Sequence, residues 1–306
     1  MVDYEIYGGN FMLPNPYAVS GVTAWGVVLD TERSAMQRLV DSTLNCRGLH
    51  DDYFVLLPRT LVSFMRMDYL RSAAQPALGS FSESELNVTF VLGRKGHFGL
   101  IWYMPFVWVD SGPALISGRD VYGYPKQMAE IRLPAAGRAE ADAWAEVLRS
   151  SGAAASRECI LSAQRKDALD WELDDLADGV DVSFDLFGER LLGIDADSIG
   201  TFFSGRLFAH LPKARMAWMR QLPSIADMGK AAFRSAAEGP FQIDLHRFGR
   251  LRGDYAVHIP FNHSVQLAQT LGLAAAGSDL TLDVDAAYYL ECDFTLGAGQ
   301  DRWIET

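Results

Sequence analysis

The amino-acid sequence predicts a mainly β protein with peripheral helices (α+β). Between residues 52 and 134, short runs rich in β-branched and aromatic residues follow one another, separated by Gly and Pro. No helical segment lies between these runs, which argues against a parallel βαβ sheet and for an antiparallel or barrel-like arrangement. Strand-like runs return after residue 240 and continue towards the end of the chain.

The chain opens with an extended segment, a strand and a helix. Residues 1–20 are rich in Gly, Pro and Asn and predict an N-terminal arm. GVTAWGVVLD, at 21–30, predicts a strand, and the residues from Asp30 predict an amphipathic helix that Asp30 or Thr31 can cap. The apolar stripe of this helix consists of Ala35, Met36, Leu39 and Val40.

Six strand-like runs follow, and the next hundred residues are less regular. The runs are YFVLLP, LVSFMRMDYL, LNVTFVLG, FGLIWYMPFVWVD, PALISG and QMAEIRLP. RAEADAWAEVLRSS, at 138–151, fits a strand and a helix equally well, and the segment 199–222 predicts some helix. FQIDLHRF, DYAVHIP and LTLDVDAAYYLECDFTL predict late strands, with a short helix at SVQLAQTLGL.

Composition excludes several functional classes. The formal charge is −12 and the pI is about 4.9, so a nucleic-acid backbone or an anionic membrane would be repelled by most of the surface. The sequence shows no secretory signal and no apolar stretch of membrane-spanning length. Three well-separated cysteines are typical of small buried residues in a reducing compartment. We therefore expect a cytoplasmic protein with neither a nucleic-acid nor a membrane partner.

Known metal and nucleotide motifs are missing from the sequence. The six histidines have no HxH or HExxH spacing, and the cysteines form no CxxC pair. No Gly-rich phosphate loop and no GxSxG elbow occurs. We expect no metal and no external cofactor.

One of the five lysines has an unusual setting, in GRDVYGYPKQMAEI. Pro125 has a fixed φ and restricts Tyr124, so the backbone that enters Lys126 is confined. Apolar neighbours would desolvate the ammonium and lower its pKa, and a neutral lysine is a nucleophile towards carbonyl carbon. The alternative from spacing alone is a surface lysine beside a turn.

ALISGRDVYGYPKQMAEI resembles the active-site segment of the acetoacetate decarboxylase family. There a Gly-Arg-acidic triplet precedes an aromatic-Pro-Lys triplet whose lysine forms a Schiff base with a keto acid. VVLDTERSAMQRLVDSTL, LVSFMRMD, FSESELNVTFVL and the last strands are also similar to parts of this family. The resemblance implies a closed, cone-shaped β-barrel with a buried pocket, in a single domain spanning 1–306 with a divergent insertion around 135–230.

The resemblance also implies site residues. Lys126 would be the nucleophile and Glu83 the proton shuttle, although a solvated position in a Ser/Glu-rich turn is an equal alternative for Glu83. Arg119, Gln127 and Tyr124 would bind substrate. For Gln127 the opposite face of its strand is an open alternative, and for Arg119 the alternative is a structural role.

Three positions depart from the pattern of the decarboxylases. Gln127 stands where they have a second lysine, Val22 where they have an arginine and Met65 where they have a glutamate. These losses of charge imply a different substrate or reaction. We therefore expect a Schiff-base-forming lyase that acts on a keto acid or ketone, of aldolase-dehydratase type, and a homo-oligomer as is common in the family. The alternatives are a β-keto acid decarboxylase and a non-catalytic small-molecule-binding barrel.

Overall fold

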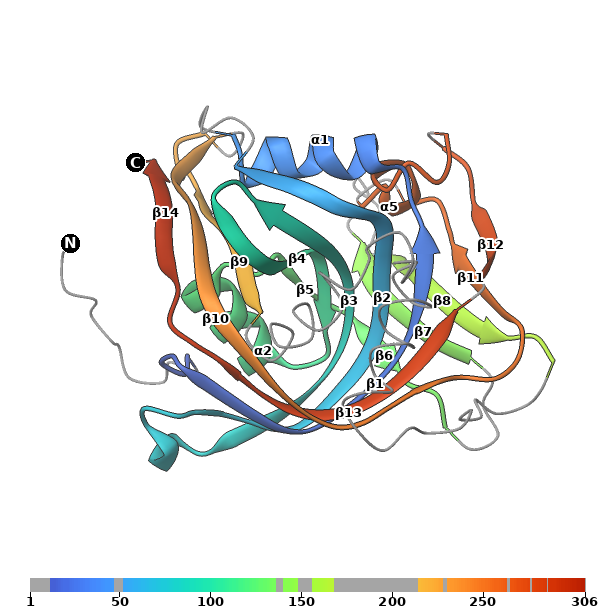
Figure 1. Cartoon of the computed structure of the whole chain (residues 1–306), viewed down its shortest axis with the longest axis horizontal. Coiled ribbons are helices and arrows are strands. Elements are labelled where there is room, and N and C mark those ends of the chain that lie inside the picture. Colours follow the sequence, from blue (N-terminus) through green and yellow to red (C-terminus); the bar gives the residue numbers. More distant parts are fainter. Residues whose placement is uncertain are drawn as a thin grey trace.

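The computed structural model describes residues 12–46, 52–135, 140–147, 156–167, 214–227, 230–262, 265–275, 277–284 and 286–305. Within these ranges most residues are in β-strands, which confirms the predicted mainly β class. The long strands curve around a common interior, as Figure 1 shows.

A large sheet contains nine strands in the described part of the chain. They are β1 (Tyr17–Asp30), β2 (Tyr53–Ser72), β3 (Ser80–Arg94), β4 (His97–Val109), β5 (Lys126–Met128), β9 (Arg215–Pro223), β10 (Ala231–Arg250), β13 (Ala287–Leu296) and β14 (Gln300–Glu305). Neighbouring strands follow the order β1-β2-β3-β4-β9-β10-β13, and β13 also pairs with β1. Most pairs are antiparallel, whereas β4 pairs in parallel with β5 and β9.

A smaller sheet lies beside the first and contains five strands in the described ranges. They are β6 (Glu130–Arg132), β7 (Glu140–Val147), β8 (Ser156–Arg165), β11 (Tyr255–Ile259) and β12 (Leu280–Val284). All pairs are antiparallel, in the order β12-β11-β8-β7-β6. A single residue, Ala129, links β5 to β6 and so connects the two sheets shortly after Lys126.

Short helices complete the described part of the chain. They are α1 (Arg33–Thr43), α2 (Gly112–Ser117) and α5 (Leu267–Thr270), with a 3₁₀ turn at Pro76–Leu78 and a turn of π-helix at Gly118–Tyr122. α1 crosses one end of the large sheet (Figure 1) and buries Ala35, Met36 and Val40 of the predicted stripe. Of the helices described, none has the length and apolar character that crossing a bilayer requires.

Two details at the start of the chain differ from the prediction. β1 begins at Tyr17, inside the predicted arm 1–20, because its first residues already pair with β2 and β13. Glu32 occupies the N-cap position of α1 without a side-chain capping bond. Asp30 instead binds Arg59, and Thr31 donates to the sulfur of Met36.

PALISG, predicted as a strand, forms most of α2. Ser111 is extended, and Pro113 stands at the start of the helix, where a fixed φ and a missing N–H are favourable. The amide of Leu115 then donates to the carbonyl of Ser111 at 3.0 Å. The helix-initiating residues Ser111 and Pro113 therefore outweigh the β-like composition of this run.

The irregular central region contains strands wherever it is described. The ambiguous segment 138–151 contributes β7, because antiparallel pairing with β6 and β8 stabilises the extended form. The end of the expected helical segment 199–222 is β9, in which Met216, Ala217 and Trp218 are buried between β4 and β10. The earlier part of that segment lies outside the described residues.

Candidate active site

Lys126 is the first residue of β5 and its side chain is 7% exposed. The parallel pairing of β5 with β4 places Lys126 opposite Val107. Its own amide donates to the carbonyl of Tyr124 at 2.7 Å, across Pro125, so the backbone folds tightly before the strand begins. The confined approach expected from Tyr124 and Pro125 therefore delivers a buried lysine.

Gly118 makes room for this lysine. A Cβ at Gly118 would lie 2.6 Å from Cδ and 2.8 Å from Cε of Lys126, closer than real contacts allow. The carbonyl of Gly118 also accepts from the amides of Gly123 and Tyr124, at 2.9 and 3.1 Å. Gly123 has φ of +89°, a left-handed conformation that glycine adopts without strain. The glycines of the motif thus let the loop close onto the lysine side chain.

Two carboxylates face the ammonium of Lys126. Its Nζ lies 3.1 and 3.3 Å from the two carboxylate oxygens of Glu83, and 3.2 Å from Oε2 of Glu85. Both glutamates are buried on β3, and residues two apart on a strand project from the same face. Burial of charged groups is tolerated when they are paired in this way.

A ladder of polar side chains continues along the same face of β3. Asn87 donates from Nδ2 to Oε1 of Glu85 at 2.9 Å, and Thr89 donates from its hydroxyl to Oδ1 of Asn87 at 3.0 Å. Asn87 and Thr89 are also buried. The amide of Asn87 thereby fixes the orientation of the Glu85 carboxylate towards Lys126.

The electrostatics of this cluster differ from the prediction for Lys126. Burial disfavours its ammonium, but attraction to Glu83 and Glu85 outweighs burial and raises the pKa of Lys126 above its ordinary value. The expected lowering of the pKa by desolvation is therefore wrong. Burial raises the pKa of Glu83 to about 7, against the opposing pull of Lys126 and with the support of Glu85. Glu83 therefore has a pKa close to neutral pH, unlike Lys126.

The cluster borders a cavity of about 440 Å³. Its polar wall consists of Ser63, Glu83, Glu85, Asn87, Thr89 and Lys126. The other walls are mainly apolar and come from strands across the curved sheet, as with Met65, Trp102, Met216, Phe248, Leu290 and Phe294. Of the described lining residues, Asp244 and Leu245 on β10 are the exposed ones and mark an opening.

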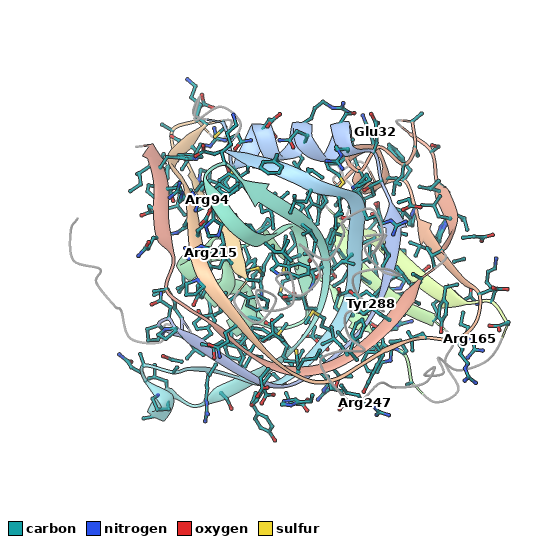
Figure 2. The ribbon with its side chains drawn as sticks, in the orientation of Figure 1. Glu32, Arg94, Arg165, Arg215, Arg247 and Tyr288 are labelled. Carbon is teal, nitrogen blue, oxygen red and sulfur yellow. The ribbon has the colours of Figure 1, made fainter. Side chains whose placement is uncertain are left out.

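Tyr288 and Ser63 close one side of the polar wall. Their hydroxyls lie 2.5 Å apart, and both residues are buried. Figure 2 labels Tyr288, which belongs to β13. Burial raises the pKa of the Tyr288 phenol to about 12, so the phenol is neutral at physiological pH. Either hydroxyl can donate the hydrogen bond between Tyr288 and Ser63.

A second buried charged group, around Glu238, lies outside the cavity lining. Glu238 binds Arg94 at 2.8 Å and Arg215 at 2.9 Å, and accepts from the hydroxyl of Tyr53 at 2.6 Å. In Figure 2 the two arginines lie together, well away from Tyr288. These pairs join β2, β3, β9 and β10, so we assign them a structural role.

The structure brings together three of the five residues expected at the site. Lys126, Glu83 and Tyr124 all line the cavity, and the ring centroid of Tyr124 is 5.8 Å from Nζ of Lys126. Gln127 is exposed and does not belong to the described lining, because successive strand residues face opposite sides. Arg119 is exposed on the π-helical turn and is likewise outside that lining.

Glu85, Asn87 and Thr89 were not anticipated as site residues. The signal was present in SELNVTF, where polar residues alternate with Leu86 and Val88. Such alternation ordinarily predicts a solvent-facing polar side. Here both faces are enclosed, since Leu86 and Val88 belong to the apolar core and the polar side faces the cavity.

No described group of three or more His, Cys, Asp or Glu side chains is arranged to hold a metal ion. Cys46, Cys159 and Cys292 are free thiols. Burial raises the pKa of Cys292, which lines the cavity, to about 12. A thiol in that state is a poor nucleophile at neutral pH.

Comparison with known proteins identifies a related family and a shared fold. Residues 8–152 match the family model of acetoacetate decarboxylase (ADC). No curated protein gives a significant match. Acetoacetate decarboxylase from Legionella pneumophila has a similar fold, with a TM-score of 0.61 and 11% identity over 96% of this chain and 90% of that one.

Two further solved structures share the fold. The enduracididine biosynthesis enzyme MppR, complexed with the condensation product of pyruvate and imidazole 4-carboxaldehyde, has a TM-score of 0.58 and 14% identity. The match covers 96% of this chain and 92% of that one. An acetoacetate decarboxylase-like enzyme from Sphingomonas wittichii has a TM-score of 0.56 and 13% identity, over 98% of both chains.

Proposed function

Because this chain belongs to the acetoacetate decarboxylase-like superfamily, we propose that it is a Schiff-base-forming lyase whose nucleophile is Lys126. The observation that carries the proposal is the contact of the buried Nζ of Lys126 with Glu83 and Glu85 at the wall of an apolar cavity. The ammonium of Lys126 and the iminium that replaces it are both cations at this position, and the two carboxylates stabilise each of them.

The first step is release of a proton from Lys126. The ammonium gives a proton to Glu83, whose pKa of about 7 suits both acceptance and return of a proton near neutral pH. The free amine adds to the substrate carbonyl, and Glu83 returns the proton as water leaves. The iminium that results keeps the positive charge where Glu83 and Glu85 already neutralise it.

The iminium withdraws electrons from the adjacent carbon and needs no external cofactor. It can form an enamine that attacks an aldehyde, and Glu83 can then assist loss of water, as in aldolase-dehydratase chemistry. We favour this reaction over decarboxylation, because the described lining contains two carboxylates beside Lys126 and no arginine to hold a substrate carboxylate.

A cofactor-independent β-keto acid decarboxylase is the second candidate. One observation favours it: two carboxylates near a substrate carboxylate would repel it and promote its loss as neutral carbon dioxide. A third candidate is a small-molecule-binding barrel without catalysis, for which the exposed position of Arg119 and Gln127 is the support.

Reductive trapping tests the proposal. Borohydride with acetoacetate, pyruvate or a simple ketone should give a covalent adduct in the intact mass of the wild type and none in Lys126→Ala. The adduct mass states whether a substrate carboxylate is kept or lost. A broad carbonyl panel that leaves the mass unchanged would favour the binding-protein candidate.

Several broader predictions belong with this function. We propose that the series of paired strands closes into the cone-shaped barrel and that residues 1–306 form one domain around the cavity. The family-divergent region around 135–230 and Tyr124 would contribute to substrate specificity. A cytoplasmic location and assembly as a homo-oligomer stay predictions, as do direct substrate contacts from Arg119 and Gln127.

A further inference from the structure

We infer that the carbonyl substrate of this site is neutral and apolar, an extended methyl ketone or comparable aldehyde rather than a small keto acid. The inference rests on the proposed Schiff-base function and names its substrate class. Three observations carry it: the charge balance beside Lys126, the composition of the cavity walls and the character of the opening.

The ammonium of Lys126 already has two carboxylate partners, so it needs no substrate carboxylate as a counter-ion. Among the described lining residues Lys126 is the single cation, and it faces Glu83 and Glu85 within 3.3 Å. A neutral ketone exchanges one cation for another, because ammonium becomes iminium. A keto acid would add a third negative group to a buried site with one positive charge, and like charges repel strongly where water is excluded.

The atoms and protons of this step balance for a neutral substrate. The ammonium of Lys126 gives one proton to Glu83, the amine forms a C–N bond with the carbonyl carbon, and a second proton moves from nitrogen to oxygen. Glu83 then returns its proton, the C–O bond breaks and water leaves. One hydrogen stays on the iminium nitrogen, and both carboxylates end in their starting state.

The cavity walls opposite the polar face are apolar and suit a hydrocarbon chain. They combine aliphatic, thioether and aromatic side chains from six strands, including Val19, Leu61, Met104, Met216, Ile243 and Leu290. The cavity volume of about 440 Å³ lies within the range of pockets that enclose drug-sized ligands. Pyruvate, with three carbons, would leave most of these walls without contact.

The opening of the cavity also favours a neutral substrate over an anion. The exposed residues of the described lining, Asp244 and Leu245, combine a negative charge with an apolar side chain. The net charge of −12 also repels anions from the surface as a whole. An anionic keto acid therefore meets repulsion at the opening and again beside Lys126, whereas a neutral ketone meets neither.

A matched series of substrates tests this inference. Apparent dissociation constants are measured from the concentration dependence of the borohydride-trapped adduct on Lys126, for methyl ketones from butanone to decanone and for α-keto acids of the same carbon number. Affinity for the ketones should rise about fourfold per added methylene, which corresponds to ~0.8 kcal/mol. Each keto acid should bind about tenfold or more weakly than its matched ketone.

Two variants show whether the cavity walls cause the chain-length effect. Leu290→Phe narrows the cavity and should weaken adduct formation by decanone more than by butanone. Leu222→Phe is the control, because Leu222 is 57% exposed on β9 and outside the described lining, and it should leave the series unchanged. Thermal unfolding of both variants confirms that each is folded.

The outcomes separate this inference from the proposed function. Adducts on Lys126 without a gain per methylene, or with keto acids bound as tightly as ketones, would overturn the apolar substrate class and leave the Schiff-base function standing. If no member of either series forms an adduct, both the substrate class and the Schiff-base function are wrong.

Discussion

Met65 on β2 is the direct antiparallel partner of Glu85 on β3. The resemblance to decarboxylases identifies Met65 as the place of a missing glutamate, which suggests a lost charge. The structure supplies a carboxylate from the opposite strand instead, with Oε2 of Glu85 at 3.2 Å from Nζ of Lys126. The Met65 sulfur contacts Asn87, the residue that orients Glu85.

Exchanging Met65 and Glu85 with each other should therefore reduce the rate of trapping less than losing the Glu85 carboxylate alone. We expect Glu85→Gln to slow trapping of a ketone on Lys126 roughly 10- to 100-fold, since hydrogen bonds to charged groups contribute about 1.5–3 kcal/mol. The double variant Met65→Glu, Glu85→Met should recover part of the rate, because opposed residues have neighbouring Cβ atoms. Equal rates for Glu85→Gln and the wild type would remove Glu85 from the reaction.

Gly118→Ala should damage function more than stability. The new methyl group would lie 2.6 Å from Cδ of Lys126 and displace its side chain from Glu83 and Glu85. Gly118 has ordinary helical dihedral angles, so strain of the backbone is not expected. Gly112→Ala is the matched control, because a Cβ there meets no atom within 4 Å. Trapping rates and thermal midpoints of the two variants make the comparison, and equal trapping rates would contradict the prediction.

Adduct formation should accelerate as the pH rises through about 7. Glu83 has a pKa of about 7 because it is buried, so it is protonated below this pH and accepts no proton from Lys126. Above this pH it is ionised and can act as the base. Initial rates of cyanoborohydride trapping from about pH 5 to about pH 9 should show this limb in the wild type. Survival of the same limb in Glu83→Gln would mean that another group titrates.

Lys126→Met should lower the stability of the fold in a pH-dependent manner. The substitution leaves Glu83 and Glu85 buried without their cation, which costs about 3–5 kcal/mol at neutral pH. The folded-state pKa of Glu83, which burial already raises to about 7, then rises further above the unfolded value of about 4.3, so stability is retained at acid pH and lost as the pH rises through the folded pKa.

Denaturant unfolding at about pH 5 and about pH 8 measures this effect. Lys230→Met is the control, because the Lys230 side chain is 78% exposed and its pair with Asp227 should contribute less than about 1 kcal/mol. A loss of stability in Lys126→Met that is the same at both pH values would contradict the assigned role of the two carboxylates.

The strand-rich class and the setting of Lys126 could be predicted from local sequence. Runs of β-branched and aromatic residues determine strands locally, and Pro125 restricts the backbone beside the lysine whatever the remainder of the chain does. Gly118 was visible in the motif, but its contact with Lys126 depends on how the loop folds back onto the β5 strand.

Glu85, Asn87 and Thr89 could not be predicted as site residues, because their position beside Lys126 depends on pairing between strands. The sequence separation between Lys126 and Glu85 says nothing about their contact, which follows from the position of β5 beside β4 and of β4 beside β3. The direction of the Lys126 pKa shift depends on that same contact. Without Glu85 in view, burial alone suggests a lowered pKa, whereas two carboxylates reverse the result.

The most direct test of the account is peptide mapping of the trapped adduct. Wild-type protein is reduced with borohydride in the presence of octanone, digested, and its five lysines are compared by tandem mass spectrometry. The account predicts one modified site, Lys126. Its mass should increase by the mass of the ketone minus one oxygen atom, because imine formation loses water and reduction then adds two hydrogens. Modification of Lys95 or another lysine in place of Lys126 would contradict the central claim.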